Sequence, residues 1–104
     1  MYLARVTATF QGKLEAALAP RQTLIRDKMN MILLAPRMAC KSERLRWQFA
    51  GKRSAHIDRR WRIIYAICEE CYQQGDQGRN LMDCPECEQV PSETVNFLDI
   101  LDYH

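Results

Sequence analysis

The chain has 104 residues, of which 47% are hydrophobic and 27% are charged, and its formal net charge is +2. These values are ordinary for a single soluble domain spanning residues 1–104, with one modest core. No apolar run approaches the roughly 20 residues that cross a bilayer, and the N-terminus lacks the apolar segment of a signal peptide, so an integral membrane protein is excluded and a cytoplasmic location is expected.

The first forty residues predict one strand and two helices. Residues 2–10 are rich in β-branched and aromatic side chains, which favours a strand. Residues 12–19 have apolar side chains at helical spacing, and Pro20 is expected to end that helix. A second helix is predicted from Arg21 up to Pro36, because apolar residues repeat there at steps of three and four. They are Leu24, Ile25, Met29, Ile32 and Leu33.

The rest of the chain predicts strands, with a cysteine-rich segment inserted among them. Apolar residues alternate over residues 43–67, which indicates a pair of strands or one long bent strand, with turns near Gly51 and near residues 58–60. Residues 93–104 predict a last strand. The expected fold is α+β in the order β-α-α-β-β-insertion-β. Because the later strands follow one another without helices, we expect an antiparallel sheet with both helices on one face.

The charge is unevenly distributed along the chain. Residues 41–62 hold eight basic and two acidic side chains, whereas residues 63–104 hold one basic and nine acidic side chains. The basic stretch fits a phosphate-binding surface, although a solvated charged face has the same composition.

Four cysteines lie in two Cys-x2-Cys pairs separated by twelve residues, a spacing that is typical of a closed, tetrahedral zinc site. The pattern predicts that residues 68–90 form a zinc-ribbon-like insertion with one structural zinc ion. Redox-active dithiols and reduced cysteines remain alternatives. Residues 68–90 also hold six acidic side chains and one arginine, which argues against phosphate contact by this segment. The expected zinc ligands are Cys68, Cys71, Cys84 and Cys87.

Two motifs outside the insertion resemble those of a known family. Residues 54–65 read Ser-Ala-His-Ile-Asp-Arg-Arg-Trp-Arg-Ile-Ile-Tyr, and residues 102–104 read Asp-Tyr-His. Together they resemble the RelE/ParE toxin superfamily, and within it the HigB, or plasmid-maintenance-killer, branch. The sequence departs from that branch at His56, where the family usually has arginine, and in the four-cysteine insertion.

The resemblance implies a RelE-like β-α-α-β-β-β fold and a function as the toxin of a type II toxin–antitoxin system. Such a toxin is a ribosome-dependent mRNA endonuclease, and its partners are a cognate antitoxin, the ribosome and mRNA. Two other readings stay open. One is a non-catalytic or gyrase-inhibiting member of the superfamily, and the other is a zinc-ribbon module that binds nucleic acid.

Metal-free RNA cleavage requires a base for the 2′-OH group, an acid for the leaving 5′-oxygen, and cations around the reacting phosphate. The only histidines are His56 and His104, and both lie in the matching motifs. We expect His104 to be the acid, since the neighbouring carboxylate of its own residue favours the imidazolium form. The base is then His56 or Asp102.

The remaining expected site residues follow from the same motifs and from the basic stretch. Arg62 and Tyr103 complete the catalytic set. Arginine clamps phosphate at two points but does not deprotonate, so it suits charge stabilisation and RNA binding and is unsuited to the role of base. The expected RNA-binding residues are Lys52, Arg53 and Arg60.

Overall fold

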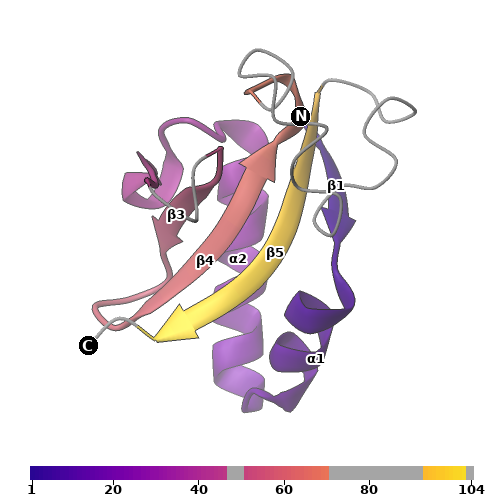
Figure 1. Ribbon diagram of the computed structural model, residues 1–104. Coiled ribbons are helices and arrows are strands. Elements are labelled where there is room, and N and C mark those ends of the chain that lie inside the picture. The colour runs from indigo at the N-terminus through magenta and orange to yellow at the C-terminus, as the bar shows by residue number, and fades with distance from the viewer. Residues whose placement is uncertain (47–50, 71–92, 103–104) are drawn as a thin grey trace.

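The computed structural model describes residues 1–46, 51–70 and 93–102, which form one mixed sheet with helices on one face (Figure 1). Within this part of the chain, no helix is both long and apolar enough to cross a membrane. The strand order in the sheet is β1-β5-β4-β3-β2. The elements are β1 (Leu3–Val6), α1 (Ala8–Ala16), α2 (Ala19–Leu34), the short 3-10 helix η1 (Ala39–Lys41), β2 (Glu43–Arg44), β3 (Arg53–His56), β4 (Trp61–Ile67) and β5 (Thr94–Asp102).

The first strand is shorter than the sequence predicts. β1 ends at Val6, and Thr7 begins the next element as the N-cap of α1, where its side-chain oxygen accepts a hydrogen bond from the amide of Phe10 at 3.1 Å. A threonine N-cap satisfies a helix amide that has no partner within the helix. Capping therefore prevails over the β-propensity of residues 7–10, and the prediction of a strand through residue 10 is wrong beyond Val6.

The expected role of Pro20 is also wrong. α1 already ends at Ala16, where the amide of Ala17 donates to the carbonyl of Leu14 at 3.2 Å. Pro20 lies in the first turn of α2. A proline there loses no helical hydrogen bond, because the first amides of a helix have no partner within it. The predicted end of α2 before Pro36 is confirmed, since the helix stops at Leu34.

The sheet is mixed, whereas the sequence predicts an antiparallel one. The pairs β2–β3, β3–β4 and β4–β5 are antiparallel, as expected for strands that follow one another. β1 pairs with β5 in parallel, with Leu3 opposite Thr94 and Val6 opposite Phe97. These two strands are the first and last of the chain, so no short hairpin constrains their relative direction.

The main core lies between the helices and the sheet. Phe10 of α1 and Ile25 and Ile32 of α2 are buried against Tyr65 of β4 and Phe97 of β5. The ring of Phe97 lies 5.5 Å from that of Phe10 and 6.3 Å from that of Tyr65. Alternate side chains of β4 therefore point toward the helices. On β5 a register shift opposite Ile64 and Tyr65 interrupts the alternation, so Phe97 and Ile100 both face the core.

Candidate functional site

Several expected site residues meet at one end of the sheet, where β3 ends, β4 begins and β5 ends (Figure 1). His56 lies opposite Arg62 in the β3–β4 ladder, and Trp61 lies opposite Asp102 in the β4–β5 ladder. Trp61 packs against the core. Because neighbouring residues of a strand alternate in direction, His56 and Arg62 share the face opposite the helices, while Trp61 and Asp102 share the helix side. The two pairs are adjacent rows of the same sheet.

Asp58 organises the turn that joins β3 to β4. One of its carboxylate oxygens accepts hydrogen bonds from the amides of Arg60 and Trp61, both at 2.9 Å, and the other contacts Arg21 at 3.2 Å. The bond from the Trp61 amide, with those from Arg60 and Arg21, lowers the pKa of Asp58 despite its partial burial. The predicted turn at residues 58–60 is confirmed, and it sets the positions of His56 and Arg62.

The surroundings of His56 favour its neutral form. Partial burial lowers the pKa of the imidazole, and the positive charges of Arg62 and Lys41 lower it further, while Glu43 acts in the opposite direction. A histidine whose pKa lies below its usual value near 6.5 is unprotonated at neutral pH. His56 is therefore able to accept a proton.

The titration of His56 tests this environment. We expect NMR titration of its imidazole protons to give a pKa below that of an ordinary histidine. Lys41→Gln removes a positive charge and should raise this pKa, whereas Glu43→Gln removes a negative charge and should lower it further. Equal shifts of the same sign in both variants would contradict the assignment, since they would point to a change of burial.

Asp102 is held by an arginine at the end of β5. Arg60 donates from Nε to Oδ1 and from Nη2 to Oδ2 of Asp102, with both distances at 2.6 Å. This two-point geometry is the strong form of an arginine–carboxylate contact. Both carboxylate oxygens of Asp102 already contact Arg60, so the arrangement favours His56 over Asp102 as the base. Arg60, which the sequence suggests as an RNA contact, has this carboxylate as a partner.

Backbone carbonyl groups hold the guanidinium of Arg62 beside His56. Its Nη1 atom donates to the carbonyl of Asp58 at 2.9 Å and to that of Trp61 at 3.2 Å. The contacts fix a permanent positive charge at the sheet end, close to the neutral imidazole. Arginine remains charged throughout the working pH range, so this group is suited to stabilising a phosphate whose charge increases during reaction.

The other two expected RNA contacts lie elsewhere. Lys52 and Arg53 are at the start of β3, and His56 is at its end. Arg53 is only 8% exposed, and its Nε and Nη2 atoms each lie 2.9 Å from a carboxylate oxygen of Glu70. This buried ion pair gives Arg53 a structural contact in place of the expected phosphate contact.

Glu70 is the centre of a charged cluster that sequence reasoning missed. Glu70 is 3% exposed, and besides Arg53 it contacts two more arginines. Its Oε2 atom lies 3.2 Å from Nε of Arg37 and 3.5 Å from Nη2 of Arg44. Burial raises the pKa of Glu70, but the hydrogen bonds and charges of these arginines outweigh it, so the net shift is downward. The only signal in the sequence is the opposite charge of residues 41–62 and 63–104.

The neighbouring Glu69 joins the same cluster. Its carboxylate binds Arg37 at 2.9 Å and accepts a hydrogen bond from the hydroxyl of Tyr2. Both glutamates belong to the start of the predicted insertion, so this start is tied to the first strand and to the segment after α2.

The structure describes one of the four predicted zinc ligands. Cys68 is fully buried, and the side-chain Nδ2 atom of Asn96 donates to its sulfur at 3.1 Å. Cys71, Cys84 and Cys87 lie outside the described residues. Within residues 1–46, 51–70 and 93–102, no group of three or more His, Cys, Asp or Glu side chains is placed to hold a metal ion.

Tyr103 and His104 also lie outside the described residues. They follow directly on Asp102, the last residue of β5, whose carboxylate Arg60 holds. Three of the five expected catalytic residues, His56, Arg62 and Asp102, lie within the described residues, and the fold places them in adjacent rows at one end of the sheet.

Comparison with solved structures places the fold among bacterial toxins. A YoeB/ParE toxin from Agrobacterium tumefaciens superposes with a TM-score of 0.68 at 14% identity, over 98% of this chain and 99% of that one. A YoeB dimer from Staphylococcus aureus gives 0.62 at 12% identity, over 99% and 97% of the two chains. The toxin–antitoxin complex RelBE2 from Mycobacterium tuberculosis gives 0.58 at 22% identity, over 99% and 98%.

No protein-family model matches the sequence, and neither does any curated protein. The likeness to solved structures covers almost the whole length of both chains, at low identity. The chain therefore has the fold of the RelE and YoeB toxins, as the resemblance in the two motifs implies.

Proposed function

We propose that this chain, which has the fold of the RelE and YoeB toxins, is the toxin of a toxin–antitoxin pair and cleaves mRNA on the ribosome. The observation that carries the proposal is the placing of a neutral His56 beside Arg62, one row from Asp102, on this fold. A base and a fixed cation in adjacent positions are two of the three kinds of group that metal-free cleavage of RNA requires, the third being an acid.

The proposed reaction uses the 2′-OH group of the RNA as the nucleophile. His56 accepts the proton of the 2′-OH while its oxygen bonds to phosphorus, and Arg62 stabilises the charge on the phosphate oxygens. In the same displacement the bond from phosphorus to the 5′-oxygen breaks, and His104 donates a proton to that oxygen. The products are a 2′,3′-cyclic phosphate and a 5′-OH end. Asp102, held by Arg60, and Tyr103 complete the site.

The HigB branch is the proposed place of the chain within this fold. Support comes from the Trp61–Arg62–Ile63 run and the Asp-Tyr-His sequence at residues 102–104. The proposed partners are a cognate antitoxin, the ribosome and mRNA. The antitoxin is supported by the RelBE2 structure, in which a toxin of this fold is bound to its antitoxin.

Inducible expression followed by mapping of mRNA 5′ ends tests the function. We expect new 5′ ends within translated reading frames, lost when translation is blocked or when the adjacent antitoxin gene is expressed as well. Growth arrest without new 5′ ends would refute the proposed endonuclease activity. Accumulation of gyrase–DNA complexes under those conditions would instead support the gyrase-inhibiting alternative, which the replacement of the family arginine by His56 favours.

We also propose that a structural zinc ion holds the insertion through Cys68, Cys71, Cys84 and Cys87. The spacing of the cysteines carries this proposal, and the amide of Asn96 beside the sulfur of Cys68 is the kind of supporting contact that metal-bound ligands have. Such an ion would be structural and take no part in the cleavage.

Metal content tests the zinc site. Protein purified in reduced form without added metal should contain about one equivalent of zinc by elemental analysis. Cys84→Ser should lose it, since structural zinc stabilises small modules by about 10 kcal/mol or more and depends on all four ligands. Cys40→Ser is the matched control and should keep the zinc. Less than about a tenth of an equivalent in the parent protein would refute the site.

A further inference from the structure

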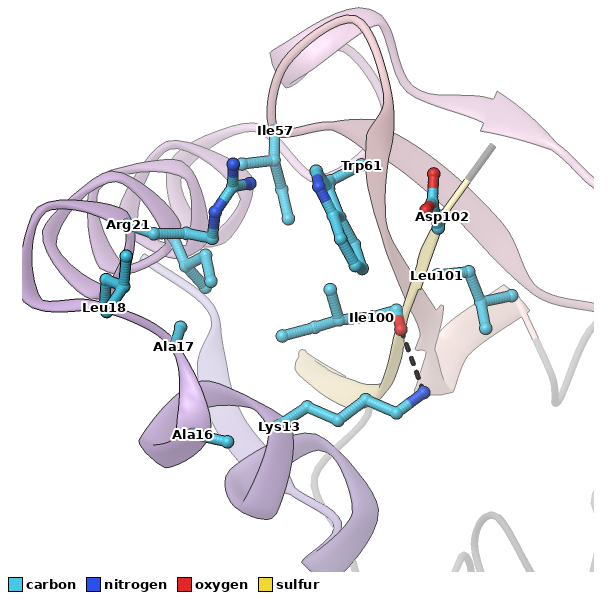
Figure 2. Close-up of a pocket in the computed structure, with 11 residues that line it drawn as sticks. Lys13, Ala16, Ala17, Leu18, Arg21, Ile57, Trp61, Ile100, Leu101 and Asp102 are labelled. Atoms are coloured by element: carbon cyan, nitrogen blue, oxygen red, sulfur yellow. Dashed lines mark hydrogen bonds between the residues drawn. The ribbon is translucent and has the colours of Figure 1, made fainter. Parts of the chain in front are cut away.

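A pocket of about 560 Å³ opens on the helix side of the sheet end, where it borders the proposed cleavage site and shares Asp102 with it. Figure 2 shows Trp61 of β4 directed into the hollow, with Lys13 of α1 and Arg21 of α2 along its edges. Its walls are mainly apolar, and its volume lies within the range of small-molecule sites. Its apolar lining is formed by Ala16, Ala17, Leu18, Ile25, Ile57, Ile100 and Leu101.

Trp61 forms one wall of the pocket, and two guanidinium groups lie near its ring. The guanidinium of Arg21 lies 5.4 Å from the centre of the Trp61 ring, and that of Arg60 lies 5.9 Å from it. Exposed bases of single-stranded nucleic acid stack on aromatic rings and on arginine planes, and the combination is common where such strands bind. An aliphatic side chain of a protein partner would not need these planar groups.

The cations at the rim are held by weak contacts. Lys13 lies 2.6 Å from Asp99 and donates to the carbonyl of Ile100 at 3.0 Å, while Arg21 lies 3.2 Å from Asp58. The side chains of Lys13 and Arg21 are 45% and 40% exposed. Exposed ion pairs contribute little to stability, so an RNA phosphate can take the place of the carboxylate at either cation.

The pocket lies within reach of the strand that the proposed site would cleave. Trp61 lines the pocket, and Arg62, the next residue of β4, belongs to the cleavage site on the other face. Successive residues of a strand are about 3.3 Å apart. An RNA chain that crosses the end of the sheet can therefore present its phosphate to Arg62 and an adjacent base to the pocket.

We infer that this pocket binds one base of the RNA next to the cleaved phosphate, with the base stacked on the planar groups of Trp61 and Arg21. The inference rests on the proposed RNA cleavage and goes beyond it, because it assigns base preference to Trp61 and Arg21, which take no part in the proposed chemistry.

Fluorescence of Trp61 measures binding separately from cleavage. Trp47→Phe leaves Trp61 as the only tryptophan. The probes are single-stranded DNA tetramers of adenine, cytosine or thymine, which lack the 2′-OH and are not cut, and an abasic tetramer. At least one base-containing tetramer should quench the fluorescence to saturation, with at least tenfold higher affinity than the abasic one. Equal affinity for all four probes would overturn the inference.

Variants locate the binding. Ala17→Phe fills the pocket and should weaken the preferred tetramer about ten- to a hundredfold, the range expected for loss of one stacked base. Ala16→Phe, at an exposed position of the same wall, should act in the same direction if Ala17→Phe does not fold. Met31→Phe places the same aromatic side chain on α2 outside the pocket and should change the affinity less than twofold. Unchanged affinity in folded Ala17→Phe and Ala16→Phe would show that the base does not bind in the pocket.

Mapping of mRNA 5′ ends separates this inference from the proposed function. Ala17→Phe should redistribute the cleavage sites, and Met31→Phe should not. Cleavage by the parent protein without base-dependent binding would refute base binding in the pocket, and the proposed endonuclease activity would be unaffected. The opposite result is a parent protein that cuts no mRNA but shows base-dependent binding, which Ala17→Phe abolishes. It would refute the endonuclease activity and support base binding in the pocket. Quenching by the antitoxin, with none by the tetramers, would assign the pocket to a protein and overturn the inference.

Discussion

Replacement of His104 by alanine is expected to slow mRNA cleavage by about 10²- to 10⁴-fold, the usual contribution of a positioned acid or base. His104 is the proposed proton donor to the leaving 5′-oxygen, and without it that oxygen must depart as an alkoxide. The rate is measured by primer extension on mRNA in purified ribosome complexes, with the circular dichroism spectrum as a check on folding. Cleavage at the parent rate would show that His104 is not the acid.

Variants at His56 extend this prediction from the acid to the proposed base. His56→Ala should slow cleavage by a similar factor, and the double variant should be little slower than either single one, because acid and base act in one concerted step. Both variants should bind ribosomes as the parent does, since neither histidine is needed for phosphate binding in the proposed site. Additive losses in the double variant would contradict a shared role.

Removal of the buried carboxylate at residue 70 is expected to lower the free energy of unfolding by about 3–5 kcal/mol. Glu70→Leu leaves Arg53, which is 8% exposed, without the carboxylate that holds it at two points. Unfolding in urea measures the loss, and the melting temperature should fall by more than about 10 °C for a domain of this size. Zinc content measured on the same samples separates loss of the ion pair from loss of metal.

Two further variants make this prediction specific. Glu69→Gln, whose ion pair with Arg37 is more exposed, should cost no more than about 1 kcal/mol. The double variant Arg53→Met, Glu70→Leu should recover much of the loss of Glu70→Leu, because a buried ion pair is often replaceable by apolar side chains but is costly to break on one side. Equal losses of unfolding free energy in Glu69→Gln and Glu70→Leu would show that the burial of Glu70 does not increase its contribution to stability.

The sequence by itself determined the elements whose signals are local. The apolar spacing in α2 predicts a helix that ends before Pro36, and the alternation around Trp61 and Tyr65 predicts β4. The turn at residues 58–60 follows from the side chain of Asp58, which binds amides two and three residues away. Each of these features depends on contacts within a few residues, which periodicity and turn chemistry describe.

Local signals were insufficient where two of them competed. The β-branched and aromatic residues at positions 6–10 favour a strand, while Thr7 favours a helix N-cap, and the helix forms. Its Phe10 is buried against Phe97, a residue 87 positions away. Burial in the core thus supports the choice that propensity alone could not make.

Only the tertiary structure decided which charged and aromatic side chains meet. Arg53 and Arg60 are both arginines of the basic stretch, and the sequence does not distinguish them. In the structure Arg53 is buried against Glu70, whereas Arg60 binds Asp102 at the end of β5. Arg21 reaches Trp61 from a helix that lies 40 positions earlier in the chain. The parallel pairing of β1 with β5 and the pocket are decided in the same way. The physical reason is that these contacts join distant segments, whose approach depends on how the helices and the sheet share one core.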